Sequence, residues 1–376
     1  MQNPPKILII EDNQASLDVM QARLVSQGYE VITAKDGAEG LERARERLPD
    51  LILSDIMMPK IDGLEVCRRI RSDPSLPFIP IILVTAKGDT ADVVAGLEAG
   101  GDEYLTKPVN HTSLVARVKS MLRIKDLHDR MAEQAEQLRL QLETASKVQT
   151  LFWAKEHQER SDLNIWSCSE PASYVGGDLY DILSMSDNSI LVYVADIAGK
   201  GVPAALLMAA LSTMIRAELP FYDDMAKLVQ TVNGSMVQLS SEEGYFATLI
   251  CGRYWPGSGR LQLLRAGHPF PLWIRQGRIL DMPWLEGIPL GIKEDVIYET
   301  CDIFLEPGDS CLFYSDGVIE AENEQGEMFG GEQLVRCIEK IQQGPWGQRV
   351  VDLVRSWRGS RPVSDDTTLL EIRQGQ

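Results

Sequence analysis

The chain has 376 residues, of which 44% are hydrophobic and 24% are charged, and its formal net charge is −18. This length predicts two or three folded domains, and the composition is that of a folded soluble protein. The negative charge argues against nucleic acid and against anionic membrane surfaces as main partners, because both attract basic proteins. The longest apolar stretch, 202–215, is shorter than a membrane span. Six scattered cysteines without a C-x-x-C pair favour reduced thiols, so a cytoplasmic protein is predicted.

The first third of the chain alternates short apolar runs with helical patterns. The runs are 6–10, 51–54, 79–84 and 103–105, and the helix-compatible stretches are 14–27, 37–47, 63–71, 90–99 and 112–123. Nearly continuous apolar runs are typical of a parallel sheet that is buried on both faces. Residues 1–123 are therefore predicted to form an α/β domain with a doubly wound, five-stranded parallel sheet.

Polar residues follow these strands at the carboxyl edge of the predicted sheet, where ligands bind. They are Glu11, Asp12, Asp55, Thr85, Tyr104 and Lys107. Clustered carboxylates repel one another unless a divalent cation lies between them, and Mg²⁺ suits one to three carboxylates plus waters. Asp55 is then placed to accept a phosphoryl group, because the metal neutralises both its charge and that of the incoming group. Lys107 and Thr85 can contact the phosphoryl oxygens, and Tyr104 can move when Thr85 is drawn inward.

Together with Asp55-Ile56-Met57-Met58-Pro59 and Lys107-Pro108, this pattern resembles the receiver domain of two-component response regulators over residues 6–123. The resemblance implies a flavodoxin-like fold, with Asp55 as phosphoacceptor and a sensor histidine kinase as phosphodonor. It implies metal ligands from Glu11, Asp12, Asp55 and the main-chain carbonyl of Met57, and a conformational relay through Thr85, Tyr104 and Lys107. A single strand-end aspartate is more often a helix cap, so the prediction depends on the residues in combination.

Residues 121–152 contain neither Gly nor Pro, and their apolar residues alternate three and four apart. The resulting seam comprises Met121, Ile124, His128, Met131, Ala135, Leu138, Leu142, Ala145, Gln149 and Phe152. This heptad pattern predicts a helical linker over residues 124–160 that forms a homodimer as a parallel two-stranded coiled coil. In the alternative, the stripe packs on the chain's own domains. His128 and Gln149 would weaken the pairing and set its register.

From residue 163 the pattern becomes rich in strands that are separated by Gly, Pro and Asp turns. Strands are expected at 188–194, 246–254, 260–265, 271–274, 277–281, 309–314 and 367–372. Helices are expected at 203–218, 225–239, 331–341 and 347–357. Strands in runs with a few long helices predict that residues 161–376 form an α+β domain, a two-sheet sandwich flanked by helices in an αββα arrangement.

This region carries four acidic motifs. They are Val175-Gly176-Gly177-Asp178-Leu179-Tyr180-Asp181, Asp196-Ile197-Ala198-Gly199-Lys200-Gly201, Ser315-Asp316-Gly317 and Ser364-Asp365-Asp366. Any one Asp-Gly pair is more often just a turn. Four such clusters at strand ends of one sandwich instead predict an all-oxygen centre for two Mg²⁺ or Mn²⁺ ions. The Gly199-Lys200-Gly201 segment lacks the spacing of a nucleotide-binding phosphate loop, which argues against a nucleoside triphosphatase.

These motifs, with Ala266-Gly267-His268-Pro269, resemble the bacterial type 2C-like metal-dependent serine/threonine protein phosphatases that regulate stress and sporulation sigma factors. The resemblance covers residues 163–373. It implies that a metal-activated water attacks phosphoserine or phosphothreonine directly, without a phosphoenzyme. The substrate that the resemblance implies is a phosphoserine protein similar to an anti-sigma factor antagonist.

The resemblance also implies individual roles. Asp196 would bridge two metal ions and be catalytic, the Ile197 carbonyl would bind one ion, and Asp316 and Asp365 would complete the second site. Asp178 would hold a metal-bound water or a third ion, with Asp181 supporting its loop.

One position at this motif departs from the family pattern: Arg265 stands where the family usually has Asn, which leaves its hydrogen bonding open. His268 belongs to the matching motif and is more often a packed structural histidine than a general acid. Residues 142–149 look like the helix that precedes the phosphatase core in this family and controls its metal site. The family usually continues with Leu-Leu-Pro, whereas this chain has Leu151-Phe152-Trp153-Ala154.

The sequence as a whole predicts a phosphorylation-controlled response regulator with a protein phosphatase as its output. A non-catalytic adaptor that binds a sigma factor or an anti-sigma regulator is the alternative, and retention of Asp178, Asp196, Asp316 and Asp365 argues against it. An enzyme acting on a small phosphorylated molecule or a nucleotide is a second alternative. It has little support, because no aromatic- and Arg-lined base motif is present.

Overall fold

The computed structural model describes residues 4–86, 90–154, 157–160, 162–240, 244–341 and 344–375. The chain separates into two compact units, Met1–Arg139 and Leu140–Gln376. One long helix, α5 (His111–Gln149), contributes residues to both units. The division into domains 1–123, 124–160 and 161–376 stays a prediction.

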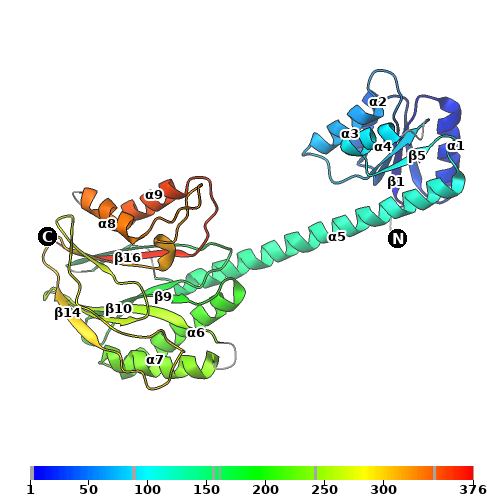
Figure 1. Cartoon of the computed structure of the whole chain (residues 1–376). Helices are drawn as coiled ribbons and strands as arrows, with labels where there is room; N and C mark the ends of the chain where they lie inside the picture. The colour runs from blue at the N-terminus through cyan, green and yellow to red at the C-terminus, as the bar shows by residue number, and fades with distance from the viewer. Residues whose placement is uncertain are drawn as a thin grey trace. The chain divides into compact units, whose positions relative to one another are not determined.

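The first unit is a parallel α/β sheet with helices (Figure 1). Its strands are β1 (Lys6–Ile10), β2 (Glu30–Ala34), β3 (Leu51–Asp55), β4 (Ile81–Thr85) and β5 (Glu103–Thr106). They pair in parallel in the order β2-β1-β3-β4-β5. The helices between them are α1 (Gln14–Val25), α2 (Gly37–Arg47), α3 (Gly63–Ser72) and α4 (Thr90–Glu98). The predicted five-stranded, doubly wound fold is confirmed.

The local sequence explains why this sheet forms. Every residue of β3 and β4 is buried, because central parallel strands are covered by helices on both faces. Three of the helices begin at side-chain caps: Asn13, Asp36 and Asp62 each accept a hydrogen bond from the amide three residues later. These abrupt strand-to-helix turns leave the carboxyl ends of β1, β3 and β5 at one edge of the sheet.

Helix α5 is one uninterrupted element and is followed by a 3₁₀ turn, η1 (Thr150–Phe152). The helices expected at 112–123 and 121–152 are therefore continuous, because neither Gly nor Pro separates them. The first turns pack on the core of the first unit through Leu114, Val118 and Met121. His128 stacks on Phe78 with ring centroids 4.5 Å apart.

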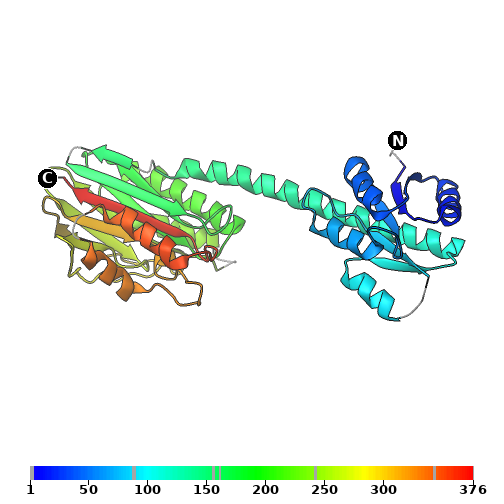
Figure 2. The ribbon, with the colours of Figure 1, turned by 90° about the horizontal axis from the view of Figure 1, so that it is seen from above.

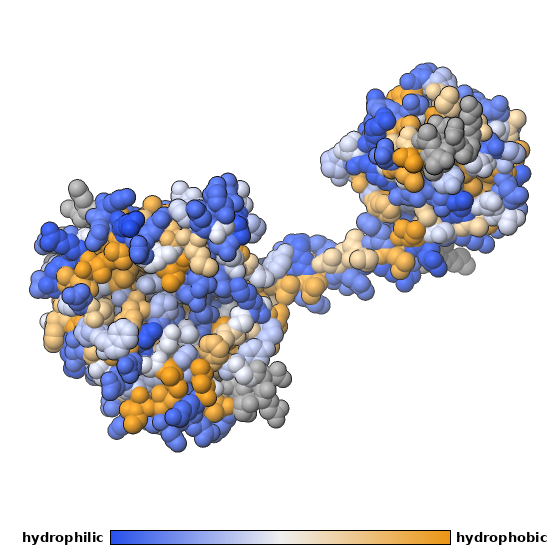
Figure 3. Space-filling view, in the orientation of Figure 1, coloured by the Kyte–Doolittle hydropathy of each residue, from blue (hydrophilic) through white to orange (hydrophobic). Residues whose placement is uncertain are grey.

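The middle of α5 carries apolar side chains beside polar ones (Figure 3). Met131 and Leu138 are 70% and 56% exposed in the single chain. Their exposure leaves the apolar stripe available for pairing, and the coiled coil stays a prediction.

The second unit is a two-sheet sandwich with a pair of helices on each outer face (Figures 1 and 2). One sheet has the order β14-β11-β10-β9-β8, and the other has the order β13-β12-β15-β16-β7-β6. The strands are β6 (His157–Arg160), β7 (Leu163–Glu170), β8 (Leu179–Ser184), β9 (Ile190–Ile197), β10 (Ala247–Trp255), β11 (Arg260–Ala266), β12 (Leu272–Arg275), β13 (Arg278–Leu280), β14 (Thr300–Phe304), β15 (Ser310–Tyr314) and β16 (Thr367–Gln374). The helices are α6 (Val202–Glu218), α7 (Met225–Ser240), α8 (Gly331–Lys340) and α9 (Trp346–Arg358). The expected αββα sandwich is confirmed.

Successive side chains along each strand point to opposite faces of the sheet, and this produces three apolar layers in the second unit. Val192, Val194 and Phe313 point between the two sheets. The residues that alternate with them in β9, such as Tyr193, pack against α6 and α7, while those in β15, such as Leu312, pack against α8 and α9. This side-chain alternation is the normal consequence of the β-strand period of two.

Four strands, β6, β7, β8 and β14, were not among those expected from sequence. β7 mixes polar and apolar residues, and β8 begins inside an acidic motif. β14 is an edge strand with a single buried residue, Ile303. Pairing with neighbouring strands decides their conformation more than their own apolar pattern does.

Within the described residues, one helical stretch, Val202–Phe221, is long and apolar enough to cross a membrane by length and composition alone. It consists of α6 and the short η2 (Leu219–Phe221). Ala204, Met208, Leu211 and Ile215 of this stretch are buried in the apolar layer against α7 and the sheet. In total, 28% of the most apolar window of this stretch is buried.

Candidate functional site

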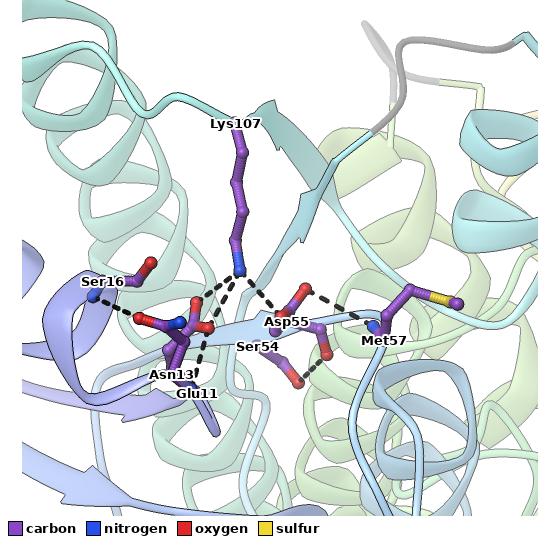
Figure 4. A network of polar contacts seen from close by, with 7 residues as sticks. All are labelled: Glu11, Asn13, Ser16, Ser54, Asp55, Met57 and Lys107. Atoms are coloured by element: carbon purple, nitrogen blue, oxygen red, sulfur yellow. Dashed lines mark hydrogen bonds and ion pairs between the residues drawn. The ribbon is translucent and has the colours of Figure 1, made fainter.

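Three charged side chains meet at the carboxyl edge of the parallel sheet (Figure 4). Glu11 follows β1, Asp55 ends β3 and Lys107 follows β5. The Lys107 Nζ atom donates hydrogen bonds to Asp55 Oδ2 at 2.7 Å and to Glu11 Oε1 at 2.9 Å. Glu11 and Asp55 are only 1% and 6% exposed. The lysine therefore supplies the positive charge that two buried carboxylates require.

The same edge forms a candidate cation site. Carboxylate oxygens of Glu11, Asp12 and Asp55 all lie within 4.8 Å of one another. Burial raises the pKa of Glu11 above its usual range, and the charge of Asp55 adds to the rise while Lys107 opposes it. Carboxylate oxygens are the ligands that Mg²⁺ prefers, so these residues fit a magnesium ion.

The remaining residues predicted for this edge lie close by. The Met57 amide donates to Asp55 Oδ1 at 3.4 Å, which places this peptide beside the carboxylate. Thr85 is buried at the end of β4, and Tyr104 of β5 lines the same small hollow. The guanidinium of Arg117 lies over the Tyr104 ring, 5.4 Å from its centroid. The predicted residues are thus brought together, and their roles in phosphorylation stay predictions.

The four acidic motifs of the second unit meet at one end of the sandwich. Asp178 precedes β8, Asp196 lies near the end of β9, Asp316 follows β15 and Asp365 precedes β16. Burial, and then the charges of Asp316 and Asp365, raise the pKa of Asp196 to about 7. Burial and then the charge of Asp196 raise the pKa of Asp178 well above its usual range. These carboxylates are therefore close enough to repel one another.

This donor set fits divalent metal ions. Divalent cations relieve repulsion between carboxylates, and aspartate oxygens suit Mg²⁺ and Mn²⁺. The Ile197 carbonyl faces the loop that carries Asp178, because its oxygen would lie 3.0 Å from a Cβ placed on Gly177. The spacing is wider than in the first unit: in the part of the chain that the structure describes, only Glu11, Asp12 and Asp55 form a group whose oxygens all lie within 4.8 Å.

Asp366 organises the loop before Asp178, a role that the sequence did not reveal. Its Oδ1 accepts a hydrogen bond from the Ala172 amide at 2.7 Å, and its Oδ2 accepts one from the Gly177 amide at 2.6 Å. A Cβ on Gly176 would lie 2.3 Å from the same Oδ2, so a larger residue at this position would displace the Asp366 carboxylate. The feature of the sequence that could have indicated this role is that Asp366 directly follows Asp365 in one of the acidic motifs.

Ser315 ties the two sheets together at this end. Its Oγ donates to Asp178 Oδ2 at 2.8 Å and accepts a hydrogen bond from the Thr368 amide at 2.9 Å. The hydroxyl thus fixes the buried Asp178 side chain relative to β15 and β16.

Gln149, the last residue of α5, joins this helix to the acidic end of the sandwich. It is 5% exposed. Its Nε2 donates to the Gly176 carbonyl at 2.6 Å, and its Oε1 accepts from the Gly176 amide at 3.1 Å. The prediction that Gln149 faces a coiled-coil partner is wrong, because a buried amide finds its hydrogen bonds in the loop. Just beyond, Trp153 Nε1 donates to the Asp178 carbonyl at 3.3 Å, so the chain after α5 also packs on this loop.

His268 is a buried residue close to the acidic cluster, and its structural role stays a prediction. It is fully buried, and burial lowers its pKa to about 3. Its Nδ1 lies 2.7 Å from Thr248 Oγ1, and Thr248 pairs with Asp196 across the sheet. Arg265, whose bonding was left open, donates to the carbonyls of His268 and Leu285.

Asp181 connects β8 to α6 rather than facing the other carboxylates. It is 1% exposed, and its Oδ2 lies 2.8 Å from Arg216 Nη2. The Tyr193 hydroxyl donates to the same oxygen at 3.3 Å. These contacts anchor the strand that follows the Asp178 loop, and the predicted supporting role of Asp181 stays a prediction.

Comparisons with known families assign both units. Residues 186–374 match the family model described as stage II sporulation protein E (SpoIIE). Residues 7–119 match the model of the response regulator receiver domain. The first match covers half of the chain, and the second covers the parallel sheet and its helices.

Two curated relatives are similar to the first unit. The chain is 50% identical over 119 residues to the transcriptional regulatory protein AfsQ1 of Streptomyces coelicolor, which covers 32% of this chain and 52% of AfsQ1. It is 41% identical over 128 residues to the response regulator PleD of Caulobacter vibrioides, which covers 34% of this chain and 28% of PleD. The chain thus spans about half or less of the length of these relatives.

A solved structure is similar to the second unit. The SiaA-PP2C domain of Pseudomonas aeruginosa superposes with a TM-score of 0.55 at 20% identity, covering 64% of this chain and 99% of that domain. This likeness shows that the sandwich has the fold of that domain.

Proposed function

Because the chain belongs to the stage II sporulation protein E (SpoIIE) family and carries a response regulator receiver domain, we propose that it is a response regulator whose output is a serine/threonine protein phosphatase. The observation that carries this proposal is the meeting of Asp178, Asp196, Asp316 and Asp365 at one end of the sandwich. In a protein that served only as an adaptor, four neighbouring carboxylates would repel one another and lower the folding stability without a function to explain them.

In this proposal the acidic end of the second unit is a metal centre. Asp196, Asp316, Asp365 and the Ile197 carbonyl would hold Mn²⁺ or Mg²⁺. Bound ions would lower the pKa of a water and neutralise charge that develops at phosphorus. The buried Asp178, held by Ser315, orients a water at the centre. Asp366 and Ser315 keep the ligands in place by fixing the loop and the strand ends.

The receiver unit provides the input. A sensor histidine kinase donates a phosphoryl group to Asp55. Glu11, Asp12, Asp55 and the Met57 carbonyl would hold the Mg²⁺ that neutralises its charge. Lys107, which already contacts Asp55, then pairs with a phosphoryl oxygen. Thr85 moves toward the phosphoryl group, and Tyr104, which lines the same shallow depression, moves when Thr85 is drawn inward.

Helix α5 carries the signal to the output. Gln149 at its end holds Gly176, and the Asp366 carboxylate holds Gly177, so a rotation or shift of the helix would move the loop of Asp178. A change from mostly inactive to mostly active requires about 5.5 kcal/mol of differential stabilisation. Dimerisation through the exposed stripe of α5 would supply it in response to phosphorylation.

The substrate in this proposal is a phosphoserine protein, similar to an anti-sigma factor antagonist, in the cytoplasm. The net charge of −18 supports a protein rather than a nucleic acid as partner. The family to which the second unit belongs supports a place in sigma factor control.

The test is hydrolysis of p-nitrophenyl phosphate by the full chain with Mn²⁺, with and without acetyl phosphate as a receiver phosphodonor. We expect metal-dependent hydrolysis by the wild type, loss of activity in Asp196→Asn, and a response to acetyl phosphate that is abolished in Asp55→Asn. No hydrolysis by the wild type in either state would contradict the phosphatase and favour the adaptor. An equal response in Asp55→Asn would contradict control by the receiver.

A further inference from the structure

A lysine lies at the rim of the acidic cluster of the second unit. Lys200 is in the turn between β9 and α6, flanked by Gly199 and Gly201, whose φ angles are 113° and 72°. Both flanking residues thus occupy the left-handed region that favours glycine. The Lys200 Nζ atom donates to the Ser364 carbonyl at 2.8 Å and pairs with Asp365 Oδ2 at 3.0 Å. The turn therefore presents this ammonium group to the segment that precedes β16.

The Lys200 ammonium retains capacity for a ligand. An ammonium group has three N–H donors, and two of them are used by Ser364 and Asp365. The side chain is 63% exposed, and that of Asp365 is 35% exposed. An ion pair this exposed contributes little to folding stability, so stability alone gives a weak reason for a lysine here.

The charge of Lys200 reaches across the cluster. Burial and neighbouring carboxylates raise the pKa values of Asp196, Asp316 and Glu320, and the charge of Lys200 opposes the rise in each case. A phosphate monoester would bring up to two further negative charges to an edge that is already acidic. A protein cation at the rim would reduce this repulsion on approach, and lysine is an effective point charge for phosphate.

We propose that Lys200 binds the phosphoryl group of the substrate and so determines the affinity of this site for phosphate esters. This inference rests on the proposed phosphatase function. The remaining N–H of Lys200 donates to a phosphoryl oxygen, while the contact with Asp365 keeps the ammonium beside the carboxylates of the metal centre. Lys200 thus couples the position of the substrate to one of the proposed metal ligands.

The test compares the wild type with Lys200→Gln and Lys200→Arg in the full chain with Mn²⁺. The first measurement is the affinity for inorganic phosphate by isothermal titration calorimetry, which requires no turnover. We expect Lys200→Gln to weaken phosphate binding about tenfold or more, as loss of a charge-assisted hydrogen bond implies. It should raise KM for p-nitrophenyl phosphate by a similar factor with a smaller change in kcat. Lys200→Arg should keep most of the affinity, because it retains a cationic donor.

A matched control is Lys227→Gln, which removes an exposed lysine of α7 and should leave phosphate binding unchanged. Equal phosphate affinity in the wild type and Lys200→Gln would overturn the proposal. A change in Mn²⁺ affinity with no change in phosphate affinity would also overturn it, since it would show that Lys200 only positions Asp365. If the wild type fails to hydrolyse p-nitrophenyl phosphate, the proposed function fails, but the phosphate titration still decides the role of Lys200. Thermal unfolding of each variant confirms that the compared proteins are folded.

Discussion

Gln149 and Gly176 exchange two hydrogen bonds, one in each direction, at 2.6 Å and 3.1 Å. Gly176 lies two residues before Asp178, so the end of α5 is bonded to the loop that enters the acidic cluster. The glutamine amide suits this place because it offers a donor and an acceptor side by side.

Replacing Gln149 by Glu should break this connection. A carboxylate keeps the acceptor for the Gly176 amide but has no donor for the carbonyl, which it would repel. We expect the free energy of unfolding of the second unit to fall by about 1–3 kcal/mol, and metal-dependent hydrolysis to fall with it. Urea unfolding and initial rates measure the two effects. Gln141→Glu on the exposed part of the same helix is the control, and equal behaviour of the two variants would contradict the role of Gln149.

Asp366→Asn tests the loop before Asp178. The two carboxylate oxygens serve the Ala172 and Gly177 amides separately, and an asparagine can accept only one of these bonds. We expect a loss of about 1–3 kcal/mol in the free energy of unfolding together with weaker Mn²⁺ binding in a calorimetric titration. The exposed Asp281→Asn is the matched control. Unchanged Mn²⁺ affinity in Asp366→Asn would show that the loop does not shape the metal centre.

His268 predicts a specific dependence of stability on pH. Burial lowers its pKa from 6.5 to about 3 in the folded protein. Between these values the unfolded chain binds a proton at this residue that the folded protein does not, so folding stability falls as the pH falls. The expected slope from this group is about 1.4 kcal/mol per pH unit.

Urea unfolding at a series of pH values below neutrality measures the slope. In His268→Asn, which cannot take up this proton, the dependence should be shallower by about one proton. Parallel curves for the two proteins would show that His268 is not buried in its neutral form.

Lys107→Met removes the cation between Glu11 and Asp55. Burial lowers the pKa of Lys107, but its bonds to Asp55 and Glu11 outweigh this and raise the pKa above the usual value, so the wild-type residue is charged at neutral pH. We expect the variant to lose about 3 kcal/mol of stability in the receiver unit, since two buried carboxylates are left without their partner. Mg²⁺ should restore much of this loss, because the ion supplies positive charge at the same place.

Thermal unfolding of the full chain with increasing Mg²⁺ measures this recovery. The exposed Lys119→Met on α5 is the control. A loss of stability that Mg²⁺ does not reduce would contradict the cation site at Glu11, Asp12 and Asp55.

The receiver unit could be predicted closely because its candidate functional residues lie at the ends of apolar runs in the sequence. Asp55 ends β3 and Lys107 follows β5, and the parallel order of the sheet brings them together without help from long loops. The sandwich was also predicted, but β8 was missed because it begins inside an acidic motif, and β14 because it is an edge strand with a single buried residue.

The supporting residues of the second unit could not be found in the same way. Gln149 and Gly176 are 27 residues apart, and Asp366 and Gly177 are 189 apart. Hydrogen bonds over such separations depend on the packing of the whole sandwich, which local patterns do not contain. Gln149 in particular satisfied a heptad pattern, although its amide is buried in the loop.

Asp365 and Asp366 are neighbours in the chain but serve different ends. Asp365 faces Lys200, whereas Asp366 holds the loop at Ala172 and Gly177. In the proposed function, a metal ligand and the residue that shapes its loop are therefore separate side chains. Under that proposal, one substitution at Asp365 would abolish catalysis while Asp366 kept the loop folded. A catalyst could then become a binding protein through a change of one residue.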